Sequence, residues 1–549
     1  MQKKHLVPRA PWATLCLSLL LVLTPWQPAS AAFGQKTELN FIVEPYLIKP
    51  GSDTMTVMFE AFCLSPTLCV REAGTSSWTR IAPSITPVLP TLRKTRITGL
   101  KADTTYFYKV ETLLRKSPEY RFHTWPRTGG DKTIARLVAI SDSQGDHPER
   151  LADVITNGII AVEGKGSVDA CSETISALLV TGDLVTHGDN KAQWVNEFFA
   201  NLQPLASRVP LIPALGNHDM TPFFYTCYFD MFPDGSLEHC LKLSRYNLLN
   251  TMILTLNSND LIQVDGLPDA GGLLQREWLL DHFYDAQDDP ATDFVLAQFH
   301  HPCKSELWPP GETERSCRFV AMLERFTADT GKPSLHLFGH THAYSRGQSR
   351  DVPHVWLNVA PTAGDIDYWG EYDMTDYDEF QKSVDEFGYC LITLQAGERP
   401  AVEMVRRSGG NGIQWFNYTD DTIADAFAIH RDNQAPEMPG IAATEYAGSL
   451  FLQGTDFIDP DGDAHLESHW QLIAETGDGK VIDIWGNHTR TENIWMGENI
   501  QDGADITRHA IPELPTGTYS ARVRYRDEGL AWSPWSEAVS ATLPPDTIR

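Results

Sequence analysis

Five apolar runs in the middle of the chain each end abruptly in Asp, Asn or His. The runs and the residues after them are RLVAI into SDSQ, ALLV into TGD, VPLIPAL into GNHD, FVLAQF into HHP, and LHLF into GHTH. In open α/β sheets, ligands gather beyond the carboxyl ends of the strands. Strands with this pattern therefore bring their terminal polar side chains together at one site.

The segment that holds these runs, residues 132–430, alternates strand-like runs with amphipathic segments. The latter are LADVITNGIIAV, AQWVNEFFANL, QREWLLDHFYDA and CRFVAMLERFTADT. This alternation predicts a layered α/β domain.

Short β runs separated by turn residues stand on both sides of this segment. Residues 35–128 and 435–549 show period-two alternation, which predicts a small β-sandwich at each end. With a length of 549 residues, about three domains are expected. The stretch QAPEMPG is the expected linker before the last one.

The first 31 residues read as a cleaved signal peptide. Lys3, Lys4 and Arg9 precede the apolar stretch ATLCLSLLLVL, and Ala29-Ser30-Ala31 fits the cleavage rule. The apolar stretch is shorter than the ~20 residues that a membrane span needs. We therefore expect a secreted or periplasmic protein without a transmembrane segment; a short uncleaved anchor helix is the alternative.

The formal net charge of −28 disfavours contact with nucleic acid phosphates, so no nucleic-acid-binding role is expected. Nine cysteines are present, and Cys16 lies in the signal peptide. The eight that remain suggest a disulfide framework in an oxidising compartment. The pairs nominated are Cys63–Cys69, Cys227–Cys240, Cys303–Cys317 and Cys171–Cys390; buried free thiols are the alternative.

The ordered motifs D-x-[HQ], GD, GNHD, H-x-P and GHxH resemble the calcineurin-like metallophosphoesterase family, over roughly half the chain. The segment ITGLKADTTYFYKVET resembles the fibronectin type III module of purple acid phosphatases. The resemblance implies a central αββα metallophosphoesterase sandwich, flanked by N- and C-terminal all-β sandwiches of the fibronectin or immunoglobulin type.

The resemblance also implies two divalent metal ions, with Mn, Fe, Zn, Mg and Ca all open. One ion would be held by Asp142, Gln144, Asp183 and His342, and the other by Asp183, Asn217, His300 and His340. Carboxylate, amide oxygen and imidazole suit such ions. A bridging carboxylate fixes the two ions about 3.5 to 4 Å apart.

Two positions depart from the family pattern. Purple acid phosphatases have a Tyr three residues after the bridging Asp, whereas Thr186 stands here, so no iron-tyrosinate colour is expected. Gln144 stands where most relatives have His, which suggests a weaker first metal site.

The implied activity is hydrolysis of phosphate mono- or diesters by in-line attack of a metal-bridging hydroxide. His218 is the candidate general acid, and Asp219 is expected to orient it. His187 and Arg346 are candidate substrate-binding residues, with a surface position and an ordinary salt bridge as the alternatives. His301 reads as a spectator beside His300.

Two further segments are rich in acidic residues. The acidic, aromatic segment Ala363 to Phe380 is expected to be a solvated loop, with a substrate lid as the alternative. Asp459, Asp461 and Asp463 offer oxygen ligands, but the motif DPDGD lacks the spacing of an EF-hand, so a turn is expected.

The competing function is a catalytically silent extracellular binding or adhesion protein, in which the β modules contact glycans or proteins. A measurement of metal content distinguishes the two functions: two equivalents of metal support the enzyme, and none supports the binding protein.

Overall fold

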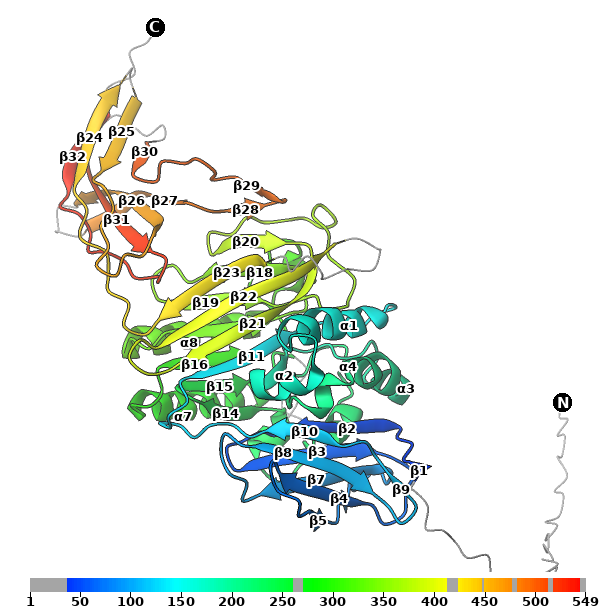
Figure 1. Ribbon diagram of the computed structural model, residues 1–549. Helices are drawn as coiled ribbons and strands as arrows, with labels where there is room; N and C mark the ends of the chain where they lie inside the picture. Colours follow the sequence, from blue (N-terminus) through cyan, green and yellow to red (C-terminus); the bar gives the residue numbers. More distant parts are fainter. Residues whose placement is uncertain are drawn as a thin grey trace, which may run out of the picture.

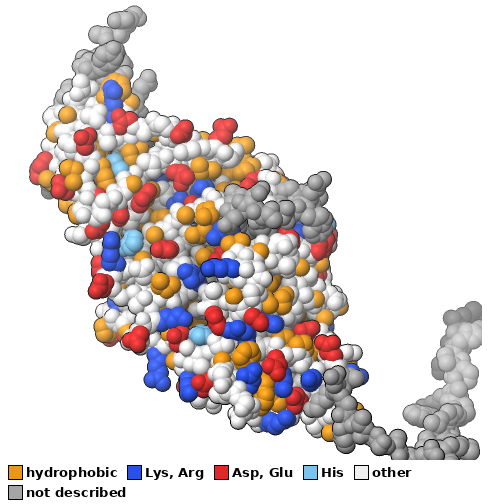
Figure 2. Space-filling model, in the orientation of Figure 1, with side chains coloured by type: hydrophobic (Ala, Val, Ile, Leu, Met, Phe, Trp, Pro, Cys, Tyr) orange, Lys and Arg blue, Asp and Glu red, His pale blue; other side chains and the backbone are white. Residues whose placement is uncertain are grey.

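The computed structural model describes residues 37–259, 270–411, 423–446, 449–475, 481–511 and 517–543. The predicted signal peptide lies outside these residues. Within them, no helix is long and apolar enough to cross a membrane. On the face drawn in Figure 2, acidic and basic side chains are intermingled from end to end.

Two central sheets pack face to face and are covered by helices on their outer sides (Figure 1). The first contains β11 (Ile134–Ile140), β12 (Ala177–Val180), β13 (Leu211–Pro213), β21 (Phe387–Gln395), β22 (Ala401–Gly410) and β23 (Ile423–His430). The second contains β14 (Ser244–Leu248), β15 (Thr251–Thr255), β16 (Phe294–Gln298), β17 (Ser334–Phe338), β18 (Tyr344–Gln348), β19 (His354–Asn358) and β20 (Phe380–Val384).

The helices lie where the amphipathic segments predict them. The first sheet is covered by α1 (Glu149–Asp153) with the π-helix η1 (Val154–Ile160), α2 (Val168–Thr174), α3 (Lys191–Gln193), η2 (Trp194–Phe199), α4 (Ala200–Leu202) and η3 (Leu205–Ser207). The second is covered by α7 (Ala270–Asp288) and α8 (Glu314–Thr330). Shorter helical turns are α5 (Phe223–Tyr228), α6 (Leu237–Leu241) and η4 (Pro309–Gly311).

Side chains that point to alternating faces of each strand form the hydrophobic cores between the layers. On β11, Val138 and Ile140 belong to the core under the helices, whereas Leu137 and Ala139 belong to the core between the two sheets. Because successive side chains of a strand point to opposite faces, an uninterrupted apolar run is what a doubly covered strand requires. The result is a mixed α/β arrangement with the layers that the sequence predicts.

The N-terminal strands form two sheets that enclose a core of their own. They are β1 (Thr37–Glu38), β2 (Val43–Ile48), β3 (Thr54–Glu60), β4 (Thr67–Glu72), β5 (Thr79–Ile81), β6 (Ser84–Ile85), β7 (Leu92–Thr98), β8 (Thr105–Glu111), β9 (Arg115–Lys116) and β10 (Tyr120–His123). Strand β2 pairs in parallel with β13, where Ile48 lies opposite Leu211. The central sheet therefore continues across the expected boundary at residues 128–132.

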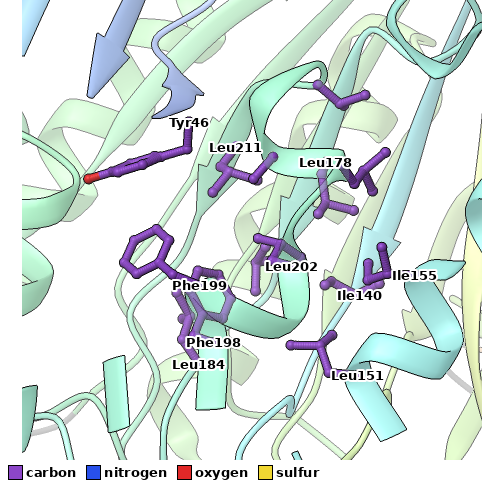
Figure 3. Packing of buried hydrophobic residues seen from close by; sticks show 14 of the residues in the cluster. Tyr46, Ile140, Leu151, Ile155, Leu178, Leu184, Phe198, Phe199, Leu202 and Leu211 are labelled. Carbon is purple, nitrogen blue, oxygen red and sulfur yellow. The ribbon is translucent and has the colours of Figure 1, made fainter. Parts of the chain in front are cut away.

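Figure 3 shows how this junction is packed. The ring of Tyr46 on β2 lies beside that of Phe199 on η2, and their centroids are 4.6 Å apart. The Tyr46 hydroxyl donates to the backbone oxygen of Tyr228 at 2.7 Å, which satisfies its one polar group inside the core.

The C-terminal strands form two further sheets around a small core. They are β24 (Ile441–Tyr446), β25 (Ser449–Gly454), β26 (His465–Glu475), β27 (Val481–Arg490), β30 (Arg508–Ala510), β31 (Gly517–Asp527) and β32 (Val539–Leu543). The hairpin of β28 (Ile494–Trp495) and β29 (Glu498–Asn499) extends the second central sheet, since Ile494 pairs with Lys382 of β20. The C-terminal strands are thus joined to the central part by backbone hydrogen bonds as well as by the linker.

One nominated disulfide is present, Cys303–Cys317, which ties the segment after His300 to α8. The other three nominated pairs are wrong, because those six cysteines are free. Cys171 and Cys390 belong to the cores on opposite faces of the first central sheet, so the sheet separates them. Cys227 is buried whereas Cys240 is exposed.

Candidate metal centre

The predicted ligands come directly after five strands, as the sequence pattern requires. Strands β11, β12 and β13 are parallel neighbours in the first sheet, and β16 and β17 are parallel neighbours in the second. Their carboxyl ends therefore open on the same edge of the sandwich. Asp142, Asp183 and His340 have φ angles of 53°, 52° and 69°, in the left-handed region that non-glycine residues seldom adopt. Strained backbone conformations of this kind cluster at functional sites.

Two glycines let the ligand loops approach one another. A Cβ on Gly216 would lie 2.1 Å from both the backbone nitrogen and Oδ1 of Asp183. A Cβ on Gly182, whose φ is +106°, would lie 2.5 Å from Nδ1 of His300. Only glycine fits at either position without displacing a predicted ligand.

The first predicted ligand group comes together. His342 Nε2 lies 3.1 Å from Asp142 Oδ1, and Gln144 Nε2 lies 3.4 Å from both Asp183 Oδ2 and His342 Nε2. The other amide atom, Gln144 Oε1, is buried without a hydrogen-bond partner among the described residues. A buried amide oxygen of this kind is costly unless something binds it. A cation beside Asp142 and Asp183 fits that requirement.

The second predicted group meets at Asp183 as well. His300 Nε2 lies 3.0 Å from Asp183 Oδ2 and 2.9 Å from Asn217 Oδ1. His300 Nδ1 faces the backbone oxygen of Thr181 at 3.0 Å, which turns Nε2 toward the carboxylate. The ring centroid of His340 lies 5.0 Å from that of His300. Asp183 therefore contacts members of both groups, as a bridging ligand must.

The buried carboxylates of the predicted metal centre favour positive charge beside them. Asp142 and Asp183 are 0% and 1% exposed. Burial opposes the protonated form of His300 and His342, yet Asp183 raises the pKa of His300 to about 9 and Asp142 raises that of His342 to about 10. Against burial, the His342 imidazole also holds the pKa of Asp142 below its usual range. The ligand atoms of Asp142, Asp183 and His300 all lie within 4.8 Å of one another, so they could hold a metal ion.

His218 lies beside the predicted ligands, with its side chain partly exposed. Its backbone N–H donates to Asp183 Oδ1 at 2.8 Å, and its Nδ1 lies 2.9 Å from the backbone oxygen of Thr186. Nε2 is then the ring nitrogen left for a substrate, 4.0 Å from Asp183 Oδ2, on a side chain that is 40% exposed. This is a suitable position for a group that exchanges protons with a substrate.

The role predicted for Asp219 is wrong. Its carboxylate accepts backbone N–H groups of Leu184 at 3.0 Å, Gly216 at 3.1 Å and Val185 at 3.4 Å. Burial and then Asp183 raise its pKa to about 7. Asp219 thus braces the loops that carry Asp183 and Asn217, while the backbone oxygen of Thr186 orients His218.

Of the two predicted substrate-binding residues, one is exposed and the other is buried. His187 is exposed, one residue after the Thr186 that anchors His218. Arg346 forms the ordinary salt bridge that was the alternative to phosphate binding, with Asp425 at 2.5 Å and Glu492 at 3.0 Å. It is buried on β18, where it joins the central sheets to the C-terminal strands.

The sequence analysis assigned no functional role to three aromatic side chains that lie near the predicted ligands. The ligand atoms of His301, predicted to be a spectator, lie within 4.8 Å of those of His300 and His340. Its Nδ1 lies 2.9 Å from Ser258 Oγ. The ring of Trp308 lies 5.1 Å from that of His340 and 5.7 Å from that of Tyr372. The doubled His in HHP was the available signal for the first of them.

A family model of calcineurin-like phosphoesterases matches residues 135–344, the part of the chain that holds all the predicted metal ligands. This match supports a phosphoesterase and implies divalent metal ions.

Solved structures share the fold at low sequence identity. A purple acid phosphatase from yellow lupin (Lupinus luteus) seeds is 15% identical with a TM-score of 0.52, over 70% of this chain and 73% of that chain. A structure of PhoD is 11% identical with a TM-score of 0.52, over 73% of this chain and 92% of that chain. No curated protein sequence matches the chain.

Proposed function

We propose that this protein is an exported hydrolase of phosphate mono- or diesters that uses two divalent metal ions. The observation that carries the proposal is the buried carboxylate of Asp183, which contacts ligands of both predicted metal groups. The signal-like N-terminus and the Cys303–Cys317 disulfide support export to an oxidising compartment.

Each residue has a distinct task in this proposal. Asp142, Gln144, Asp183 and His342 hold one ion, and Asp183, Asn217, His300 and His340 hold the other. When bound, the two ions acidify a water molecule and offset charge on the phosphoryl oxygens.

His218 supplies the proton that the leaving oxygen needs. Thr186 fixes its ring through Nδ1, which leaves Nε2 to carry that proton. His187, exposed beside Thr186, is proposed to contact the substrate at the rim.

The aromatic side chains suggest what kind of leaving group the site accepts. The Trp308 ring lies between the rings of the predicted ligand His340 and Tyr372, tilted by 42° and 41° to them, and Tyr372 is 40% exposed. An aromatic surface beside the reacting centre favours a planar leaving group, since ring contacts contribute about 0.5 to 1.5 kcal/mol. We therefore propose aryl-type or similarly flat phosphate esters as preferred substrates.

The test combines metal analysis with a substrate panel. Purified protein should contain two equivalents of metal and should hydrolyse aryl phosphates or bis-aryl phosphates with at least one of Mn, Fe, Zn, Mg and Ca. Protein that binds no metal and hydrolyses none of these esters would instead be the silent binding protein.

Trp308→Ala tests the leaving-group proposal separately. It should raise KM for aryl esters about 3- to 10-fold and leave KM for alkyl esters and the metal content unchanged. An equal loss for aryl and alkyl esters would contradict the aromatic contact while leaving the metal centre intact.

A further inference from the structure

The acidic segment (residues 363–380) begins beside the candidate metal centre. Asp367 Oδ2 accepts the backbone N–H of the predicted ligand His342 at 2.7 Å, and the Asp367 N–H donates to the backbone oxygen of His342 at 3.1 Å. Gly364 approaches so closely that a Cβ there would lie 2.8 Å from His342 Cε1. One end of the acidic segment is therefore fixed against a predicted metal ligand.

The middle of the acidic segment carries Tyr372. Its ring lies 5.7 Å from that of Trp308, and the Trp308 ring lies 5.1 Å from that of His340. Residues 370–373 are all exposed. An exposed segment with few buried apolar contacts opens at little cost in free energy unless other elements hold it. The position of Tyr372 therefore depends on the contacts that anchor the acidic segment on either side of it.

A contact from the C-terminal strands stands before Tyr372 in the sequence. The hairpin of β28 and β29 lies beside β20 in Figure 1. The ring of Trp495 on β28 lies 5.0 Å from that of Trp369, at an interplanar angle of 60°. Edge-on ring pairs of this kind are a favourable arrangement for two aromatic side chains. Trp495 thus holds the acidic segment three residues before Tyr372.

Further contacts stand after Tyr372. Asn493, which precedes β28, donates from Nδ2 to Asp376 Oδ1 at 3.2 Å. Arg490 of β27 donates to the backbone oxygen of Asp378 at 3.0 Å. In the central part, Glu306 accepts the backbone N–H of Tyr377 at 3.2 Å. Both parts of the chain therefore hold the acidic segment on this side.

We propose that the hairpin of β28 and β29 positions the acidic segment and thereby determines how well the site selects flat leaving groups. Trp495 and Asn493 are positioning residues, because they contact the segment that places Tyr372 beside Trp308. The C-terminal strands would then contribute to substrate selection without contacting the substrate. This inference rests on the proposed function, since it concerns the leaving group of the same reaction.

Limited proteolysis tests the anchoring and requires no activity. A protease that cleaves after Glu can cut the acidic segment at Glu371, and mass spectrometry identifies the fragments. Trp495→Ala should accelerate this cleavage about 3- to 10-fold, because it removes one aromatic contact and cleavage follows the population of the open segment. Trp495→Phe retains a ring and should restore most of the protection. Asp376→Ala, made at an exposed position, should also accelerate cleavage.

Kinetics on the same preparations test the consequence for the site. In Trp495→Ala, KM for aryl esters should rise about 3-fold or more, because Tyr372 is held less firmly beside Trp308. The change has the same direction as that expected for Trp308→Ala. KM for alkyl esters, kcat and the metal content should stay at their wild-type values, and Trp495→Phe should recover the low KM for aryl esters.

The matched control is Met496→Ala, at the next residue of the hairpin, which is 52% exposed and should behave as wild type. The inference is overturned if Trp495→Ala is cleaved no faster than wild type, or if its KM for aryl esters is unchanged. An equal loss for aryl and alkyl esters, or no rescue by Trp495→Phe, would overturn it too. Wild type that hydrolyses no ester would refute the proposed function, and proteolysis would still decide whether the hairpin holds the acidic segment.

Discussion

Replacing His218 with alanine separates proton transfer from metal binding. His218 reaches Asp183 Oδ1 through its backbone N–H, at 2.8 Å, and alanine preserves that contact. The ring contacts the Thr186 backbone oxygen, and the side chain is 40% exposed. His218→Ala should therefore change the free energy of unfolding by no more than about 0.5 kcal/mol.

Turnover should fall much more than stability. Loss of a general acid reduces the rate by ~100-fold or more, which corresponds to about 2.7 kcal/mol of transition-state stabilisation. The reduction should be largest for esters whose leaving group is a poor one, because they depend most on protonation. Activated aryl esters should be affected least.

The assay measures metal content, kcat and KM on the same preparations, with His123→Ala on β10 as the control for a histidine remote from the site. If His218→Ala loses metal, His218 is a ligand or supports one, and the assignment is wrong. Equal rate losses for good and poor leaving groups would also refute the general-acid role.

Three more substitutions and one pH titration probe the rest of the site and the buried carboxyl group of Asp527. Asp183→Ala should lose both ions by metal analysis and leave essentially no activity, because both ligand groups meet at this carboxylate. Gln144→Ala should weaken metal affinity by about tenfold or more and recover activity with excess metal, since charged and imidazole ligands remain. Gly216→Ala should cut turnover by ~100-fold, because its Cβ would lie 2.1 Å from Asp183 Oδ1. Denaturant titrations of wild type should show stability falling, relative to Asp527→Asn, as pH rises from ~4 to about 7.

The sign of the pH prediction is set by linkage. Asp527 has a folded-state pKa of about 7, above its unfolded value, so the folded protein binds the proton more tightly. This stabilisation is complete below the unfolded pKa and is lost as pH rises through the folded one. Asp459 and Asp463 face the carboxyl group, while the Asn433 amide and the Ala531 N–H donate to it. Arg526, its neighbour on β31, also interacts with it.

Much of the predicted metal centre could be read from the sequence alone. Uninterrupted apolar runs identify strands that are covered on both faces, and parallel strands place their carboxyl ends on one edge, so the residues after each strand are expected to meet. The position directly after a strand was predicted in this way for Asp142, Asp183, Asn217, His300 and His340, and their assignment as metal ligands comes from the family resemblance. The four amphipathic segments likewise predicted the covering helices, because the 3.6-residue period is a local property.

Only the tertiary structure decided which distant groups neutralise one another. Arg346 comes four residues after a ligand motif, yet it pairs with Asp425, 79 residues away along the chain. Asp219 is adjacent to His218 in the sequence, but its carboxylate accepts the backbone N–H of Leu184. The pKa of Asp527 is raised by burial and by the charges of Asp459 and Asp463, which lie more than 60 residues before it in the sequence. Local sequence determines where a strand ends and which side chains come directly after it, whereas the partner of a buried charge depends on which elements the fold brings beside it.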